Sequence, residues 1–152
     1  MNLVVDIGNS RMKVAVFSGG EIVERWTFGC REIGRFDEIF SRYAGFDRAI
    51  LSSTRDENPE PEEMLRCRSG YFLKFANTVP VPLENGYGTP HTLGCDRLAA
   101  AVGGVGMLPG RNLMIVDFGS AITCDIVTAE GRYLGGSISP GLGMRFRSLA
   151  DY

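Results

Sequence analysis

A short motif that occurs twice is the feature that most limits how this chain can fold. Residues 3–8 read LVVDIG and residues 114–119 read MIVDFG, so Asp-x-Gly returns 111 residues later. The same offset pairs Gly131 with Gly20 and Ile126-Val127 with Ala15-Val16. Each copy predicts a strand, an Asp-x-Gly turn, a strand, a glycine turn and a third strand. Because an internal repeat indicates repeated architecture, we expect two lobes of related fold that face one another.

The second copy covers less of a lobe than the first. Within the 152 residues it reaches a strand at 133–138 and the beginning of a helix after Pro140-Gly141. We therefore expect a first lobe at 1–110 and an incomplete second lobe at 111–152. Apolar residues of the second sheet are expected to lack their cover, namely Ile126, Val127, Tyr133, Leu134 and Ile138. We expect this region to self-associate, to be covered by other protein, or to be poorly ordered.

The remaining pattern predicts alternating strands and helices. Three β-rich segments with the Ser18-Gly19-Gly20 turn predict an antiparallel meander, and Asn58-Pro59-Glu60-Pro61 suits a helix start. The expected strands are 3–5, 12–17, 21–28, 48–53 and 71–75, and the expected helices are 32–43, 62–67 and 96–105. The irregular segment 77–93 is long for a connection inside a compact domain, which favours a functional loop.

Charge and composition argue against several classes of protein. The formal net charge is −2 and the isoelectric point is near 5.4, which makes nucleic acid a poor partner. No apolar run approaches the ~20 residues of a membrane span, and the N-terminus lacks a secretion signal, so a cytoplasmic protein without a membrane partner is expected. Four scattered cysteines and one histidine predict reduced thiols, not a zinc site.

The first Asp-x-Gly turn carries groups that suit a phosphate. Gly8 leaves out a side chain where the chain reverses, so backbone N–H groups and the polar side chains of Asn9 and Ser10 can converge. Basic residues follow at once, and an aspartate such as Asp6 beside a phosphate usually orients hydrated Mg²⁺. A plain hairpin is the alternative. The second copy favours phosphate, because two facing turns can hold a polyphosphate and its metal; neither a Walker motif nor G-x-G-x-x-G is present.

Four motifs, in order, resemble those of the type III pantothenate kinase family. They are DIGNS at 6–10, GCDR at 94–97, DFGSA at 117–121 and GGSISPG at 135–141. The paired Asp-x-Gly hairpins are also similar to the phosphate motifs of the acetate and sugar kinase, Hsp70 and actin superfamily. The resemblance implies an α/β fold of the actin-like ATPase (ribonuclease H-like) type with duplicated lobes, the second incomplete in this chain.

The activity is implied in the same way. The resemblance implies ATP-dependent phosphorylation of pantothenate to 4'-phosphopantothenate, the first step of coenzyme A biosynthesis. It implies a homodimeric enzyme that needs ATP, Mg²⁺ and a monovalent cation, K⁺ or NH₄⁺. Family members continue past the region present here, so we expect these 152 residues alone to be nearly inactive.

Site residues carry over by position. The resemblance implies that Asp96 is the general base on the pantothenate hydroxyl and that Asp117 binds the monovalent cation. It implies pantothenate contacts from Tyr87, Gly94, Cys95, Asp96 and Arg97, and ATP contacts from Asp6, Ile7, Gly8, Asn9, Ser10, Arg11, Met12, Lys13 and Ser120. Cys95 and Ser120 stand where the family usually has a small apolar residue and a threonine, and both departures are mild.

The residues themselves leave other interpretations open. Asp96 follows a glycine at a predicted helix start, where the helix dipole favours an ionised carboxylate, but Asp is also a common N-cap. Arg97 could be a surface residue, and Tyr87 could simply pack the loop. Two other functions stay open: a kinase-like regulatory or nucleotide-binding protein without catalysis, and a different small-molecule kinase. The presence of both Asp6 and Asp96 favours the enzyme, because a binding module needs no base.

Overall fold

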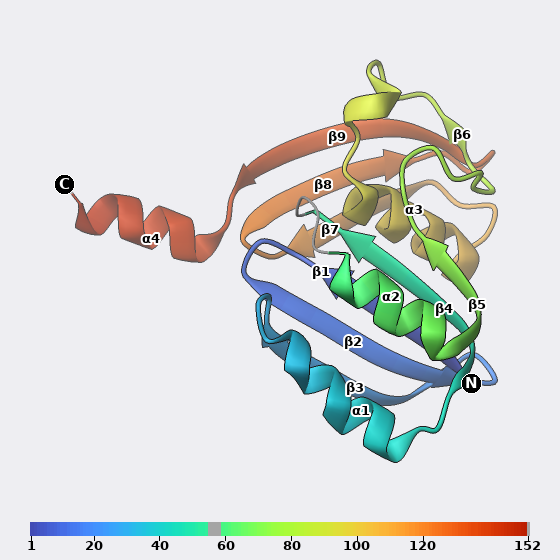
Figure 1. Ribbon diagram of the computed structural model, residues 1–152. Coiled ribbons are helices and arrows are strands. Elements are labelled where there is room, and N and C mark those ends of the chain that lie inside the picture. Colours follow the sequence, from blue (N-terminus) through green and yellow to red (C-terminus); the bar gives the residue numbers. More distant parts are fainter. Residues whose placement is uncertain (55–58, 152) are drawn as a thin grey trace. The chain divides into compact units, whose positions relative to one another are not determined.

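Two compact units make up the chain. The computed structural model describes residues 1–54 and 59–151 (Figure 1). The units are Met1–Ala76 and Asn77–Tyr152. This division follows packing and assigns segment 77–110 to the second unit, whereas the predicted boundary between 110 and 111 marks where the repeated motif begins. The lobes at 1–110 and 111–152 stay a prediction.

A five-stranded mixed sheet forms the first unit. Its strands are β1 (Asn2–Ile7), β2 (Arg11–Ser18), β3 (Glu21–Gly29), β4 (Phe46–Ser53) and β5 (Ser69–Lys74), in the order β3-β2-β1-β4-β5. The first three are antiparallel, which confirms the predicted meander, and Gly19 and Gly20 turn it with φ of 58° and 91°. β4 and β5 run parallel to β1.

Helices α1 and α2 link the strands of the first unit. α1 (Phe36–Arg42) follows a 3-10 turn, η1 (Ile33–Arg35), so the helix predicted over 32–43 is split in two. Gly34 explains the split, because glycine disfavours regular helix. α2 (Glu60–Cys67) begins at the predicted prolines, and Asn58 lies outside the described residues.

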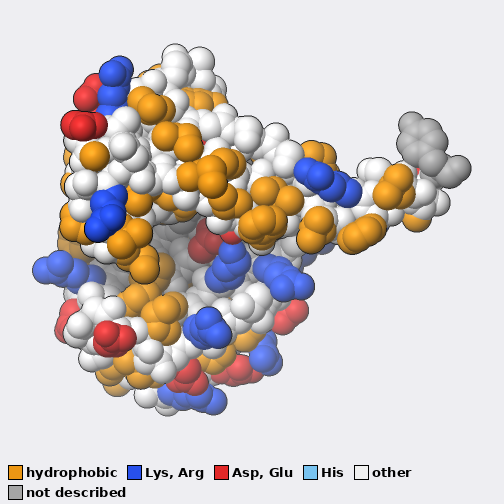
Figure 2. Space-filling view, turned by 180° about the vertical axis from the view of Figure 1, so that it is seen from behind, with side chains coloured by type: hydrophobic (Ala, Val, Ile, Leu, Met, Phe, Trp, Pro, Cys, Tyr) orange, Lys and Arg blue, Asp and Glu red, His pale blue; other side chains and the backbone are white. Residues whose placement is uncertain are grey.

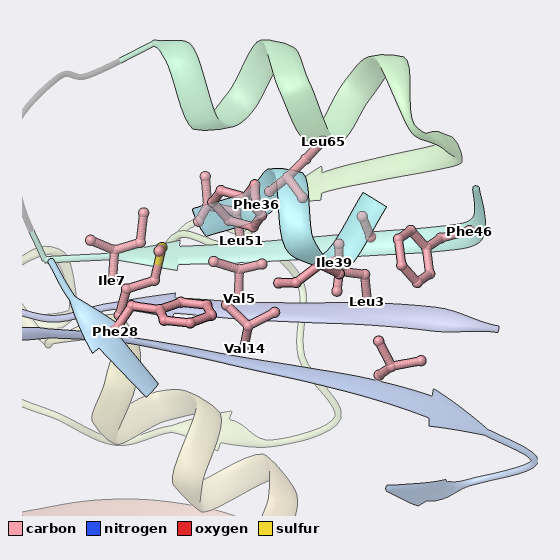
Figure 3. Packing of buried hydrophobic residues seen from close by; sticks show 13 residues of the cluster. Leu3, Val5, Ile7, Val14, Phe28, Phe36, Ile39, Phe46, Leu51 and Leu65 are labelled. Carbon is pink, nitrogen blue, oxygen red and sulfur yellow. The ribbon is translucent and has the colours of Figure 1, made fainter. Parts of the chain in front are cut away.

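One face of this sheet holds the core of the first unit. Alternate side chains of β1 point inward and meet α1 and α2, as Figure 3 shows. The residues at the centre of this packing are Leu3, Val5, Ile7, Phe36, Ile39 and Leu65. The alternation that buries them places Asp6 on the opposite face of the sheet.

The second unit is built on a four-stranded sheet. Its strands are β6 (Glu84–Asn85), β7 (Leu113–Phe118), β8 (Ala121–Val127) and β9 (Arg132–Pro140), in the order β6-β9-β8-β7. α3 (Cys95–Met107) packs against β7 and β8, and α4 (Leu142–Ala150) follows β9. The segment predicted to be irregular contains β6, which pairs with β9, and a 3-10 turn, η2 (Pro90–Thr92). No helix in the two described ranges is both long and apolar enough to cross a membrane.

The repeated motif occupies equivalent positions in the two units. β7, β8 and β9 form an antiparallel meander like that of β1, β2 and β3. Asp6 and Asp117 each stand one residue before the end of the first strand, and Gly8 and Gly119 each follow it. The prediction of equivalent strand-to-strand turns is therefore confirmed.

The second turn is one residue shorter than the first. Asp6 lies opposite Lys13, seven residues on, whereas Asp117 lies opposite Thr123, six residues on. The predicted pairing of Ile126-Val127 with Ala15-Val16 is therefore wrong by one residue, because the constant offset assumed turns of equal length. Asp125, not Ile126, stands at the place of Ala15.

The two sheets bury opposite faces. In β1, Leu3 is 1% exposed, whereas its counterpart Met114 in β7 is 68% exposed. The helix of the second unit covers the other face, where a Cβ added to Gly104 of α3 would lie 3.0 Å from Cδ1 of Ile115. The face that helices cover in the first unit is thus open in the second.

The residues predicted to be uncovered fall into an exposed group and a buried group, according to the sheet face on which they lie. Ile126, Leu134 and Ile138 are exposed, as expected. Val127 and Tyr133 are fully buried, contrary to expectation, because they lie on the side of the sheet that packs under α3. α4 has no buried residue, and Figure 2 shows hydrophobic side chains at its surface. Self-association through this region stays a prediction.

Candidate functional site

The first Asp-x-Gly turn is held by one hydrogen bond within the turn and by hydrogen bonds from two neighbouring segments. The Gly8 N–H donates to the Arg11 carbonyl at 2.9 Å, so this group is already used within the turn. The Cys30 N–H donates to the Ser10 carbonyl at 3.3 Å, which ties the end of β3 to the turn. The Thr54 N–H donates to the Ile7 carbonyl at 3.0 Å. The turn is therefore a braced loop, which suits a site that must hold a ligand in a fixed place.

Asp6 and Lys13 lie side by side next to this turn. Lys13 Nζ is 3.9 Å from Asp6 Oδ2, and both side chains are more than one third exposed. They line a hollow of about 480 Å³ in the first unit, together with Val4, Val14, Ala15, Ile22, Arg25, Trp26 and Thr27. An exposed pair of this kind contributes at most about 1 kcal/mol. Redirecting the ammonium group to a phosphate would therefore cost little.

The second Asp-x-Gly turn is packed against the junction of β9 and α4. The Gly119 N–H donates to the Ala121 carbonyl at 2.9 Å, and the Gly141 N–H donates to the Ser120 carbonyl at 3.0 Å. A Cβ on Gly141 would lie 2.4 Å from the Gly119 oxygen, so only glycine fits there. The motif 135–141 thus fixes the turn that carries Ser120.

Asp96 lies at the exposed N-terminal end of α3. The N-cap residue is Gly94, not Asp96, so the N-cap interpretation of Asp96 is wrong. The Arg97 N–H donates to Asp96 Oδ1 at 2.9 Å. A Cβ on Gly94 would lie 2.5 Å from the same oxygen, so a larger residue there would displace this carboxylate. Asp96 is thus an exposed carboxylate at the positive end of a helix, where a negative charge is favoured.

Arg97 points the other way, into the second unit. It is 5% exposed and pairs with Asp125, which is 1% exposed, so the surface-residue interpretation of Arg97 is wrong. Its Nε donates to both Asp125 oxygens at 3.1 Å, and Tyr133 Oη donates to Asp125 Oδ1 at 2.7 Å. The hydrogen bond to Asp125 raises the pKa of Arg97, and burial raises the pKa of Tyr133. Both donors therefore stay protonated at neutral pH.

Tyr87 closes this cluster from the loop side. The guanidinium carbon of Arg97 lies 5.5 Å from the centre of the Tyr87 ring, close enough for a cation–π contact. The ring also lies against Gly135, where φ is 86° and a Cβ would be 2.7 Å from the ring. The Tyr87 N–H donates to Asn85 Oδ1 at 3.0 Å. Tyr87 therefore does pack the loop, and it also lies beside Arg97. That either residue contacts the substrate stays a prediction.

Asp117 shares a sheet face with Ile115, the face on which α3 packs. It is exposed and lies opposite Thr123. Within residues 1–54 and 59–151, no three His, Cys, Asp or Glu side chains are close enough together to hold a metal ion. A cation at Asp117 would need ligands beyond such a cluster, so its role there stays a prediction.

Sequence reasoning missed Asp125 and Tyr133. The signal was a charged residue inside the segment ITCDIV, which otherwise reads as a buried strand. An acidic residue there indicates a buried partner of opposite charge. The constant offset of 111 residues aligned Asp125 with Val14, whereas the strand pairing places it at the position of Ala15.

Sequence comparison identifies relatives over the whole chain. The pattern that defines the family "Type III pantothenate kinase" matches residues 2–152. The chain is 40% identical to the type III pantothenate kinase of Christiangramia forsetii, over 100% of this chain and 63% of that protein. It is 42% identical to that of Porphyromonas gingivalis strain W83, over 97% of this chain and 60% of that protein. The chain thus spans about three fifths of the length of these curated relatives.

Solved structures share the fold at low sequence identity. A Baf family putative transcriptional activator from Campylobacter jejuni matches with a TM-score of 0.56 and 21% identity, over 98% of this chain and 59% of that one. The activator of 2-hydroxyisocaproyl-CoA dehydratase from Clostridium difficile matches with a TM-score of 0.53 and 12% identity, over 91% of this chain and 45% of that one. The predicted actin-like α/β fold with duplicated, partly present lobes is confirmed.

Proposed function

The chain belongs to the type III pantothenate kinase family, and we propose from this that the protein phosphorylates the hydroxyl of pantothenate with ATP, the first step of coenzyme A biosynthesis. One structural observation supports the proposal in addition to membership of the family. The carboxylate of Asp96 is exposed at the start of α3 and accepts the N–H of Arg97, whose guanidinium group contacts the Tyr87 ring. The family resemblance assigns all three residues to the pantothenate site. Phosphoryl transfer to an alcohol needs such a carboxylate next to the acceptor.

Asp96 is the proposed base. As the bond between the substrate oxygen and the γ-phosphorus forms, the hydroxyl proton passes to the Asp96 carboxylate and the bond to the leaving ADP oxygen breaks. The first turn of α3 presents its backbone N–H groups at the same helix end as this carboxylate. Cys95 and Gly94 belong to the same turn and are proposed to line the pantothenate site with Tyr87.

The first turn suits the phosphates of ATP. Asp6 and Lys13 supply a carboxylate and an ammonium group to the lining of the hollow, and Mg²⁺ needs only one or two carboxylates beside the phosphates. Residues 6–13 and Ser120 are proposed to hold the nucleotide. When bound, Mg²⁺ neutralises charge that builds up on the phosphate oxygens. A monovalent cation at Asp117, a homodimer and a cytoplasmic location are parts of the same proposal.

A kinase assay on the natural full-length protein tests the proposal. With ATP, Mg²⁺ and K⁺ present, we expect ADP and 4'-phosphopantothenate in equal amounts, and ADP only when pantothenate is added. Product mass spectrometry and a coupled ADP assay measure the two. ATP binding without turnover would instead support the regulatory protein, and turnover with another alcohol only would support a different small-molecule kinase.

The chain has two lysines, Lys13 and Lys74, and they provide a matched test of the nucleotide site. Lys13→Ala is expected to weaken ATP binding roughly 10- to 100-fold, because a hydrogen bond to a charged group contributes about 1.5–3 kcal/mol. Lys74→Ala is the control: Lys74 is similarly exposed, lies on β5 and pairs with Glu62. Titration calorimetry with ATP measures both dissociation constants. Equal affinities for the two variants would remove Lys13 from the site.

A further inference from the structure

A buried carboxylate in the second unit takes no part in the chemistry proposed above. Asp125 lies inside β8, away from solvent, and its charge is costly there unless it is fully paired. The side chains of Arg97 and Tyr133 supply that pairing. Such an arrangement is costly to build into a strand that could have held an apolar residue. It therefore calls for an explanation in terms of what it holds in place.

One end of this arrangement is the start of α3. Arg97 follows Asp96 directly, and its backbone N–H donates to Asp96 Oδ1. Its side chain is fixed by two hydrogen bonds from Nε to Asp125, with a further one from Nη2 to Oδ1. A forked pairing of this kind fixes orientation as well as distance. The first turn of α3 is thus fastened to β8 at the residue next to the proposed base.

The other end is the loop that carries Tyr87. The Tyr87 ring stacks near the Arg97 guanidinium and lies 6.2 Å, centre to centre, from the Tyr133 ring. Tyr133 in turn donates its hydroxyl proton to Asp125. The loop therefore contacts both residues that hydrogen-bond to Asp125, and one of them, Arg97, belongs to the start of α3.

We propose that Asp125, together with the hydroxyl of Tyr133, is a positioning residue that sets the place of Asp96 and Tyr87 through Arg97. This inference rests on the proposed function, since it concerns the geometry of the same pantothenate site. The inference also gives Arg97 a positioning role in place of direct contact with the substrate. With its guanidinium group turned inward and 5% exposed, Arg97 acts through its neighbours.

Tyr133→Phe is the decisive variant, because it removes one hydroxyl and keeps the ring. Asp125→Asn is the more direct change, but it leaves the buried Arg97 charge poorly compensated, and the variant is at risk of not folding. Misplacing a reacting group by about 1 Å can cost roughly 100-fold in rate. For Tyr133→Phe in the full-length protein, we expect kcat/KM for pantothenate to fall roughly 10- to 100-fold. Tyr71→Phe is the matched control, since Tyr71 is 59% exposed on β5 of the first unit.

Several readouts separate positioning from a loss of folded protein. A positioning role predicts that Tyr133→Phe raises the KM for pantothenate and lowers kcat. The dissociation constant for ATP and the number of ATP molecules bound per protein chain should stay unchanged. A positioning role also predicts faster amide hydrogen exchange over residues 87–97. If Tyr133→Phe matches Tyr71→Phe in pantothenate kinetics and in exchange over this segment, the positioning role is overturned. The role is also overturned if only the amount of ATP-binding protein falls. A wild-type protein that fails to phosphorylate pantothenate overturns the proposed function itself, and this role with it.

Discussion

Asp96→Asn is expected to lower pantothenate turnover of the full-length protein by roughly 10²–10⁴-fold, the usual contribution of a general base. Asn keeps the size of the side chain and an oxygen that can accept the Arg97 N–H, so the start of α3 should be preserved. It cannot take up the hydroxyl proton. The expected signature is a lowered kcat with nearly unchanged ATP affinity, measured by steady-state kinetics and calorimetry.

The control for this variant is Asp37→Asn. Asp37 is also an exposed acidic residue in the first turn of a helix, α1, but it lies outside the proposed site. Its replacement should leave kcat within about twofold of the wild type, because Asp37 lies outside the proposed site and surface substitutions usually change folding stability by less than about 0.5 kcal/mol. Near-normal turnover of Asp96→Asn would contradict the role of Asp96 as base. A fall in both variants would point to a general effect of helix charge instead.

Gly136→Ala is expected to have the largest effect on the fold of the second unit. A Cβ at this position would lie 1.7 Å from the carbonyl oxygen of Cys124 and 2.9 Å from Cα of Asp125. Both atoms belong to the backbone of β8, so β8 and β9 would have to separate. Overpacking typically costs about 1–3 kcal/mol, and we expect a value near the upper end because the contacts are with backbone atoms. Hydrogen exchange along β8 and β9 and urea unfolding of the full-length protein measure the loss.

Gly103→Ala tests the same substitution where there is room. Apart from the adjoining residues and backbone of α3 itself, no atom in the described part of the chain lies within 4 Å of a Cβ on Gly103, in the interior of this helix. Alanine should therefore stabilise the helix by about 1 kcal/mol relative to glycine. If hydrogen exchange in β8 and β9 of Gly136→Ala is as slow as in the wild type, the two strands do not approach each other closely enough at Gly136 to exclude a Cβ.

Local sequence patterns were sufficient for most of the fold. The alternation of apolar residues in β1 and β2, the glycine turn between β2 and β3, and the prolines at the start of α2 each act within a few residues. The regular helix expected over 32–43 was interrupted by Gly34, whose effect depends on how well the neighbouring turn is packed. The short strand β6 depends on a distant partner, β9, and no local pattern in residues 77–93 indicates it.

The candidate site was predictable only where motifs carried it. The turn at 6–8 and the start of α3 were found through Asp-x-Gly and GCDR. The partner of Arg97 was not, because the residues of that ion pair are 28 apart in the sequence and belong to different elements. The sequence also did not predict which face of the sheet formed by β7 and β8 is buried. That depends on where α3 packs, and alternation alone does not choose between two apolar faces.

The opposite burial of the two meanders limits what hydropathy can say about this repeat. A position that tolerates only an apolar side chain in one copy corresponds to an open position in the other, as Leu3 and Met114 illustrate. Substitution patterns in the two halves should therefore run out of phase along the strands. The two patterns should agree at Asp-x-Gly, because the backbone geometry of the turn determines which residues are tolerated there. The choice of buried face has no influence at these positions. A search for further copies of this architecture should weight the turns and disregard strand polarity.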